Sequence, residues 1–203
     1  HGESKYIDCL ERTLYNGVIS GMSMDGGRFF YPNPLSSDGK YKFNADGNTT
    51  RQPWFGCACC PSNLCRFIPS VPGYLYGVKD NNVYVNLFAA STSTVQVNGK
   101  DVTLEQTTEY PWQGDITLRV KQCKAKGTNL LVRVPGWVRN QVVPSDLYAY
   151  SDTLRPAYSI TVNGKTVTAD LEKTNGYVPV CGVKRGDVVR IHFDMPVRTV
   201  IAN

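Results

Sequence analysis

The sequence predicts a mainly β protein, in which a short helical segment precedes a β-sandwich or jelly-roll domain. Near the start of the chain, residues 6–24 and 61–68 carry apolar side chains at three- and four-residue steps, the spacing of amphipathic helices. From Gly73 onward the chain instead consists of short runs rich in Val, Ile, Thr and Tyr, separated by turn residues. We therefore expect a domain boundary near residues 73–82, with a helical domain over residues 1–75 and the sandwich over residues 76–203.

The first helix is predicted over residues 6–24, with Leu10, Leu14 and Val18 on one apolar face. The glycines and prolines that follow end it, and the polar residues 36–52 predict a surface loop. Only one short helix is nearby to cover the apolar face. We therefore expect it to pack against helices that precede His1, which would make the chain the C-terminal part of a longer protein whose targeting signal and compartment stay open.

The sandwich is predicted from ten short runs, which we expect to pair as antiparallel strands. Two of them turn at Asn-Gly, the commonest two-residue hairpin signal, in STVQVNGKDVTL and YSITVNGKTVTA. The runs are YLYGV, NVYVNLFA, STVQVNG, DVTLEQ, DITLRVK, NLLVRVPGW, YSITVNG, KTVTADL, GYVPVCGV and DVVRIHFDM.

Composition excludes several classes of protein. The net charge of +5 comes from Lys and Arg spread evenly along the chain, so no nucleic-acid partner is predicted. No apolar run approaches the roughly 18 residues of a membrane span. Seven cysteines are an odd number, and three crowd into residues 57–60, so a framework of disulfides is not expected.

The cysteine cluster of WFGCACCPSN is open to four interpretations. A helix starting in the Pro-Ser-Asn run would place Cys59 and Cys60 beside its N-terminus, where a thiolate is favoured. They could ligate zinc, although this chain shows no second Cys or His pair to complete the site, or Cys59 could be a nucleophile. A redox pair of Cys57 and Cys60 lacks the surrounding βαβ pattern. Finally, the cysteines could be small buried residues of a tight turn.

Three further residues are candidates for contact with a sugar. Glu11 on the first helix could meet a substrate, or it could be a solvated carboxylate paired with Arg12 or Lys5. Tyr31, between prolines and aromatic residues, could form a stacking platform. Trp54, just before the cysteines, is the best candidate for a binding-site wall.

The remaining candidates lie among the predicted strands. Trp112 and Trp137 fall in sandwich loops, where we expect structural or interfacial roles. His192 sits in a strand pattern, and we expect it to line a sheet face rather than hold a metal.

Two segments together resemble a known family. ERTLYNGVISGMSMDGGRFFYPNPL and WFGCACCPSNLCRFIPSVPGYLYGV are similar to glycoside hydrolase family 127, the β-L-arabinofuranosidases, and to the related family 146. LLVRVPGWV, YSITVNGK and GYVPVCGVKRGDVVRIHFDMPVR resemble the β-sandwich of that family. The likeness spans nearly the whole chain, and the CACCP motif is its most specific element.

The resemblance implies an (α/α)6 catalytic barrel followed by jelly-roll domains, so residues 1–75 would be the last part of the barrel. It also implies a zinc ion held by three cysteines and a glutamate, and a retaining mechanism with a cysteine nucleophile. By motif match, Cys59 is the nucleophile and a zinc ligand, and Cys60 is a ligand. Glu11 and Tyr31 fall at positions that resemble the substrate-contacting Glu and Tyr of the family.

The remaining ligands and the acid/base glutamate would belong to barrel segments upstream of His1, so we expect the isolated chain to be inactive. The expected partners are an arabinose-containing glycan and the N-terminal barrel portion of the same protein. The alternative function is a non-catalytic β-sandwich module that binds carbohydrate or supports the barrel around a structural zinc. A thiol redox protein is a third possibility.

Overall fold

The computed structural model describes residues 2–203, which form two compact units. One comprises residues 2–9 with residues 74–203 and is built around β-sheets, and the other is the segment Leu10–Gly73. The predicted division between residues 75 and 76 stays a prediction. None of the helices within residues 2–203 has the length and apolar character needed to cross a membrane.

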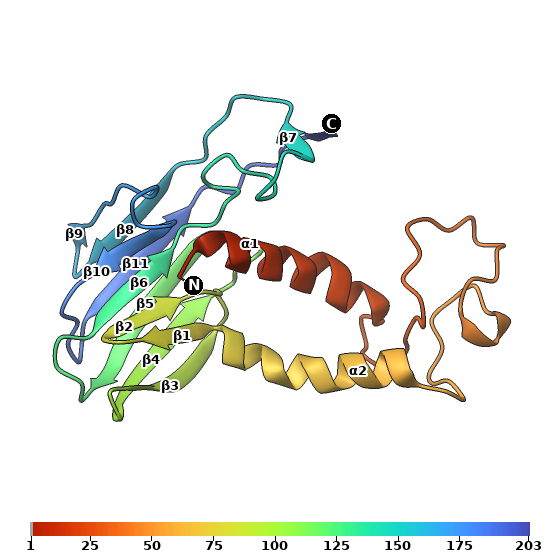
Figure 1. Ribbon diagram of the computed structural model, residues 1–203, viewed down its shortest axis with the longest axis horizontal. Coiled ribbons are helices and arrows are strands. Elements are labelled where there is room, and N and C mark those ends of the chain that lie inside the picture. The colour runs from red at the N-terminus through yellow and green to blue at the C-terminus, as the bar shows by residue number, and fades with distance from the viewer. Residues whose placement is uncertain (1) are drawn as a thin grey trace. The chain divides into compact units, whose positions relative to one another are not determined.

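The β-rich unit is a sandwich of two sheets (Figure 1). A four-stranded sheet has the order β1-β2-β6-β10, and a six-stranded sheet has the order β3-β4-β5-β11-β8-β9. Their strands are β1 (Tyr76–Lys79), β2 (Asn82–Val85), β3 (Ser91–Val97), β4 (Lys100–Thr108), β5 (Asp115–Cys123), β6 (Asn129–Arg133), β8 (Tyr158–Val162), β9 (Lys165–Thr166), β10 (Tyr177–Val180) and β11 (Val188–Phe193). Each lies within one of the ten predicted runs or overlaps it.

Alternate residues of the long strands are buried, as a strand with one face on a core requires. The six-stranded sheet contributes a layer of fully buried side chains from β4, β5 and β11, and the four-stranded sheet contributes another from β2 and β6. This core includes Leu104, Leu118, Val189, Val83, Val85, Leu130 and Val132.

Both predicted Asn-Gly hairpins are present. Asn98 and Gly99 connect β3 to β4, and Asn163 and Gly164 connect β8 to β9. All four residues have positive φ, the conformation that a two-residue hairpin turn of this type demands. Local turn chemistry therefore sets these two connections.

The expectation of a purely antiparallel sandwich is wrong at one pair of strands. β2 and β6 run parallel, with Val83 opposite Leu130 and Val85 opposite Val132. Parallel neighbours need a long crossover. The hairpins β3-β4 and β4-β5 of the opposite sheet supply it, and no local sequence signal marks such a pairing.

A third, two-stranded sheet was not predicted. It pairs β7 (Tyr148–Tyr150) with β12 (Val200–Ala202), close to the C-terminal end in Figure 1. The guanidinium of Arg198 lies 3.4 Å from the ring centroid of Tyr150 and donates to Asp152 at 2.7 Å. Strands of three residues are too short to show an alternating pattern.

The helical elements begin with α1 (Ser4–Arg12) and continue through a π-helical segment over Thr13–Val18 and a 3₁₀ turn over Ile19–Gly21. A helix over most of residues 6–24 is thus confirmed, with its later turns irregular. α2 (Cys59–Phe67) runs into a 3₁₀ segment over Ile68–Tyr74. None of the apolar side chains between residues 4 and 20 is fully buried, and Ile19 is 41% exposed.

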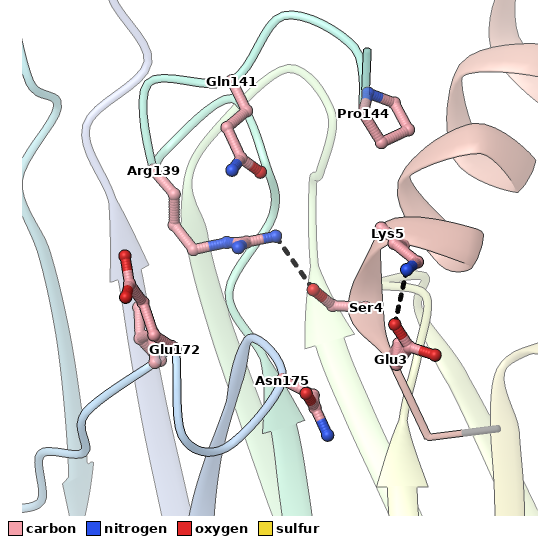
Figure 2. A pocket seen from close by; sticks show the side chains of 9 residues that line it. Glu3, Ser4, Lys5, Arg139, Gln141, Pro144, Glu172 and Asn175 are labelled. Carbon is pink, nitrogen blue, oxygen red and sulfur yellow. Dashed lines mark hydrogen bonds and ion pairs between the residues drawn. The ribbon is translucent and has the colours of Figure 1, made fainter.

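Ion pairs and hydrogen bonds attach the first turns of α1 to the sandwich. Asp8 accepts from Arg133 at 2.7 Å, from Arg139 at 3.1 Å and from the Gly136 amide at 3.0 Å. Arg139 also donates to Ser4 at 2.9 Å, beside a polar pocket of about 320 Å³ that Figure 2 shows. Because the Arg133 side chain is fully buried, Asp8 neutralises a charge that has no access to water.

Candidate active site around Cys59

Cys59 and Cys60 lie in the first turn of α2, which begins two residues earlier than the Pro-Ser-Asn run predicts, and Cys57 precedes the helix. The helix begins at Cys59, so Pro61 is its third residue. A proline is tolerated there because the first-turn N–H groups have no partner within the helix. Cys57, Cys59 and Cys60 are all exposed free thiols, so the interpretation as buried turn residues is wrong.

The closest contact of Cys59 is with Tyr31. The phenol oxygen lies 2.6 Å from the Cys59 Sγ, across 28 residues of sequence. This hydrogen bond is the main cause of a lowered pKa of Cys59 and of a pKa of Tyr31 raised well above its ordinary value. Both directions correspond to a phenol that stays protonated and donates to a thiolate.

Cys60 differs from its neighbour. Its Sγ lies 3.9 Å from that of Cys59. Desolvation, together with the adjacent Cys59 sulfur, raises the pKa of Cys60. Of the two thiols, Cys59 is therefore the one whose pKa the neighbouring groups lower, which favours its thiolate form.

The side chain of Asn44 holds Tyr31 in place. Its Oδ1 accepts from the Tyr31 amide at 2.7 Å, and its Nδ2 donates to the Thr50 carbonyl at 2.9 Å. Asn44 is 3% exposed, and the Tyr31 ring packs edge-on against Phe55 at 5.4 Å. Asn44 is not predictable from the sequence, because an asparagine inside a polar loop carries no signal of burial.

Trp54 lies on the same unit but has no described hydrogen bond or ring contact with Cys59. Its ring is 50% exposed and meets Phe29 edge-on at 5.9 Å. The exposed part of the ring leaves a wall available for a ligand. The role of Trp54 in substrate binding stays a prediction.

Glu11 is buried, with 7% of its surface exposed. The alternative of a solvated helix carboxylate is therefore wrong. Lys5, one of the two partners considered for it, pairs with Glu3 at 2.6 Å. Whether Glu11 contacts substrate stays a prediction.

The thiol pair fits half of a zinc site. Two sulfur ligands of a tetrahedral zinc ion, each about 2.3 Å from the metal, lie about 3.8 Å apart. The 3.9 Å between Cys59 and Cys60 matches that spacing. Within the described residues 2–203, no group of three or more His, Cys, Asp and Glu side chains could hold a metal ion.

His192 lies elsewhere, on the exposed face of β11 as expected. Its two ring nitrogens contact Asp115 at 2.7 Å and Asp194 at 3.2 Å. These carboxylates raise the pKa of His192, chiefly through the hydrogen bond with Asp115.

Two family models match the chain in succession. The catalytic domain of GH127 β-L-arabinofuranosidase matches residues 1–73, and the GH127 middle domain matches residues 82–195. The non-reducing end β-L-arabinofuranosidase of Bifidobacterium longum is 34% identical over 212 residues, which cover 99% of this chain and 29% of that protein.

Similar solved structures come from the same family as the two matching models. The GH127 β-arabinofuranosidase BT3674 has a TM-score of 0.90 and 54% identity, covering 100% of this chain and 30% of its own. Ara127N-Se, a GH127 β-L-arabinofuranosidase from Geobacillus stearothermophilus T6, has a TM-score of 0.79 and 35% identity. The match covers 99% of this chain and 30% of that structure. The chain thus spans less than a third of the length of these relatives. The predicted fold class, a β-sandwich preceded by the last helices of an (α/α)6 barrel, is confirmed.

Since both domain models and these relatives point to one family, this chain belongs to glycoside hydrolase family 127.

Proposed function

We propose that this chain contributes the nucleophile of a retaining β-L-arabinofuranosidase, and that Cys59 is that nucleophile. One observation carries the proposal: the Tyr31 phenol lies 2.6 Å from the Cys59 Sγ, in the part of the chain that the GH127 catalytic domain matches. A donor held on this sulfur favours the thiolate, which is the reactive form of cysteine.

In the proposed reaction, the Cys59 thiolate attacks the anomeric carbon of an arabinofuranoside. A carbon–sulfur bond forms, the glycosidic carbon–oxygen bond breaks, and a carboxylic acid elsewhere in the enzyme protonates the departing oxygen. Water then displaces the thiolate from the same carbon and gives its proton to that carboxylate. Two displacements return the sugar with its original configuration.

Cys59 and Cys60 would hold a zinc ion, with the remaining ligands supplied by other parts of the enzyme. When bound, the ion would keep Cys59 deprotonated at neutral pH. The spacing of the two sulfurs supports this assignment. Tyr31 would orient the Cys59 side chain, while Glu11 and Trp54 would contact the substrate.

The N-terminal part of the same enzyme is the proposed partner of the Leu10–Gly73 unit. Met24 and Leu35 are fully exposed apolar side chains of this unit, and Tyr41 is 72% exposed. Such residues indicate a surface that other parts of a catalytic domain cover.

The test is Cys59→Ala in the complete enzyme that carries this chain. We expect a loss of about 10⁴-fold or more in kcat/KM toward p-nitrophenyl β-L-arabinofuranoside, because the nucleophile is removed. Cys57→Ala is the matched control and should keep its activity, since no role is assigned to that thiol. Activity that survives in Cys59→Ala at the level of Cys57→Ala would refute the proposal.

A further inference from the structure

An open groove of about 510 Å³ lies on the sandwich, away from the cysteine cluster in sequence, and Trp112 is part of its lining. The Trp112 side chain is 88% exposed, so it serves no core. A large aromatic side chain left in water indicates a binding surface more often than an ordinary exposed residue does.

The loop that carries Trp112 is held firmly between β4 and β5. The Trp112 amide donates to the Glu109 carbonyl at 2.9 Å, and the Gln113 side chain donates to the Glu109 carboxylate at 2.7 Å. Gly114 lies so close to β11 that an added Cβ would come 1.9 Å from the Phe193 carbonyl oxygen. The indole is therefore presented on a fixed support, which lowers the entropy lost when a ligand binds.

Groups that accept and groups that donate hydrogen bonds line the groove together with Trp112. One of them is His192, which is held between the carboxylates of Asp115 and Asp194, both of which are exposed. Another is Arg155, which has no described ion pair or hydrogen bond within residues 2–203. Carboxylates accept from hydroxyl groups and a guanidinium donates to them.

This combination suits a sugar. A sugar ring offers a C–H face that stacks on an aromatic ring and a rim of hydroxyls that need acceptors and donors together. The groove also falls within the size range of small-ligand sites. A purely apolar partner would leave the Asp194 carboxylate and the Arg155 guanidinium desolvated without compensation.

We propose that the Trp112 groove is a carbohydrate-binding subsite for a sugar residue of an arabinose-bearing glycan, remote in sequence from Cys59. The identity of the glycan rests on the proposed function, whereas the subsite itself rests on the groove. It would keep the enzyme on a polymeric substrate between successive cleavages.

The experiment is affinity electrophoresis of the 203-residue chain in gels that contain plant arabinan, arabinogalactan, mannan or hydroxyethylcellulose. We expect arabinan or arabinogalactan to retard the chain, and Trp112→Ala to weaken that retardation about tenfold or more. Arg155→Met should weaken it as well. Tyr41→Ala is the matched control, because it removes an aromatic side chain that is exposed elsewhere.

Each outcome decides the proposal. Retardation by an arabinose-bearing glycan that Trp112→Ala loses, at an unchanged melting temperature, supports it. No retardation, equal retardation of Trp112→Ala, or retardation by mannan or hydroxyethylcellulose alone overturns it. None of these results depends on hydrolysis, so a failure here leaves the test of Cys59 intact, and a failure of Cys59 leaves this one intact.

Discussion

At the scale of single residues, the contact between Tyr31 and Cys59 is the feature with the most direct chemical consequence. A phenol 2.6 Å from a sulfur fixes the direction in which the sulfur presents its lone pairs. The buried side chain of Asn44 accepts a hydrogen bond from the Tyr31 amide and so fixes the backbone that carries the phenol. The proposed nucleophile is thus oriented by a residue that is itself positioned by hydrogen bonds.

Tyr31→Phe in the complete enzyme should lower kcat/KM toward an arabinofuranoside by about tenfold to a hundredfold, since a hydrogen bond to a charged group is worth roughly 1.5–3 kcal/mol. The ring and its packing on Phe55 are retained, so circular dichroism and zinc content should match the wild type. Tyr148→Phe, which changes an exposed tyrosine of the β-rich unit, is the control. Equal activity of the two variants would show that the phenol does not position Cys59.

His192 predicts a pH dependence of stability. Its pKa is raised by Asp115 and then Asp194, so its contribution is complete below the unfolded value near 6.5 and is lost as the pH rises through the higher folded value. Partial desolvation of the imidazole lowers the pKa and opposes the effect. Because these groups are exposed, the contribution is under about 1 kcal/mol.

Thermal melts of wild type and His192→Gln test this dependence. At pH 5.5 the melting temperature of the wild type should exceed that of His192→Gln by up to about 2–4 °C. This difference should disappear by about pH 8.5. A difference of the same size at both pH values would exclude the protonated imidazole as its cause.

At the scale of elements, the Asp8 carboxylate makes three of the polar contacts that attach α1 to the sandwich. Asp8→Asn should lower the free energy of unfolding by about 3–5 kcal/mol, because the change leaves the Arg133 charge buried without its partner. Glu3→Gln breaks the exposed pair with Lys5 and should cost under about 1 kcal/mol. Urea unfolding of both variants gives the comparison, and a loss for Asp8→Asn no greater than for Glu3→Gln would contradict this assignment.

The burial of α1 shows why its polar attachment to the sandwich matters. α1 presents no fully buried apolar side chain in this chain, so packing of its own apolar face does not hold it. Asp8 and Arg133 lie 125 residues apart in sequence yet meet at 2.7 Å. The ion pair with Arg133, together with hydrogen bonds from two further donors, Arg139 and the Gly136 amide, substitutes here for an apolar contact.

At the scale of the whole molecule, the proposed function has Cys59 and Cys60 supply two of the four ligands that a zinc site needs. Within residues 2–203 no group of three candidate ligands comes together. The 203-residue chain by itself should therefore bind zinc weakly and release no arabinose from p-nitrophenyl β-L-arabinofuranoside. The Bifidobacterium longum relative is the positive control, and measurable release by this chain alone would contradict the proposed division of the site.

Features that depend on near neighbours can be read from the sequence alone. Ten strand runs and two Asn-Gly turns were predicted because alternation and turn conformation are properties of consecutive residues. The crowding of Cys57, Cys59 and Cys60 beside a helix start was likewise visible, with an error of two residues in where the helix begins.

The three-dimensional packing sets which distant residues meet. It paired β2 with β6 in parallel, placed the Tyr31 phenol on Cys59, buried Asn44 and Glu11, and left Trp112 in water. The physical reason is common to all of them. These contacts join segments whose approach is set by the packing of the whole core, and the residues involved carry no local pattern that distinguishes a partner from a surface.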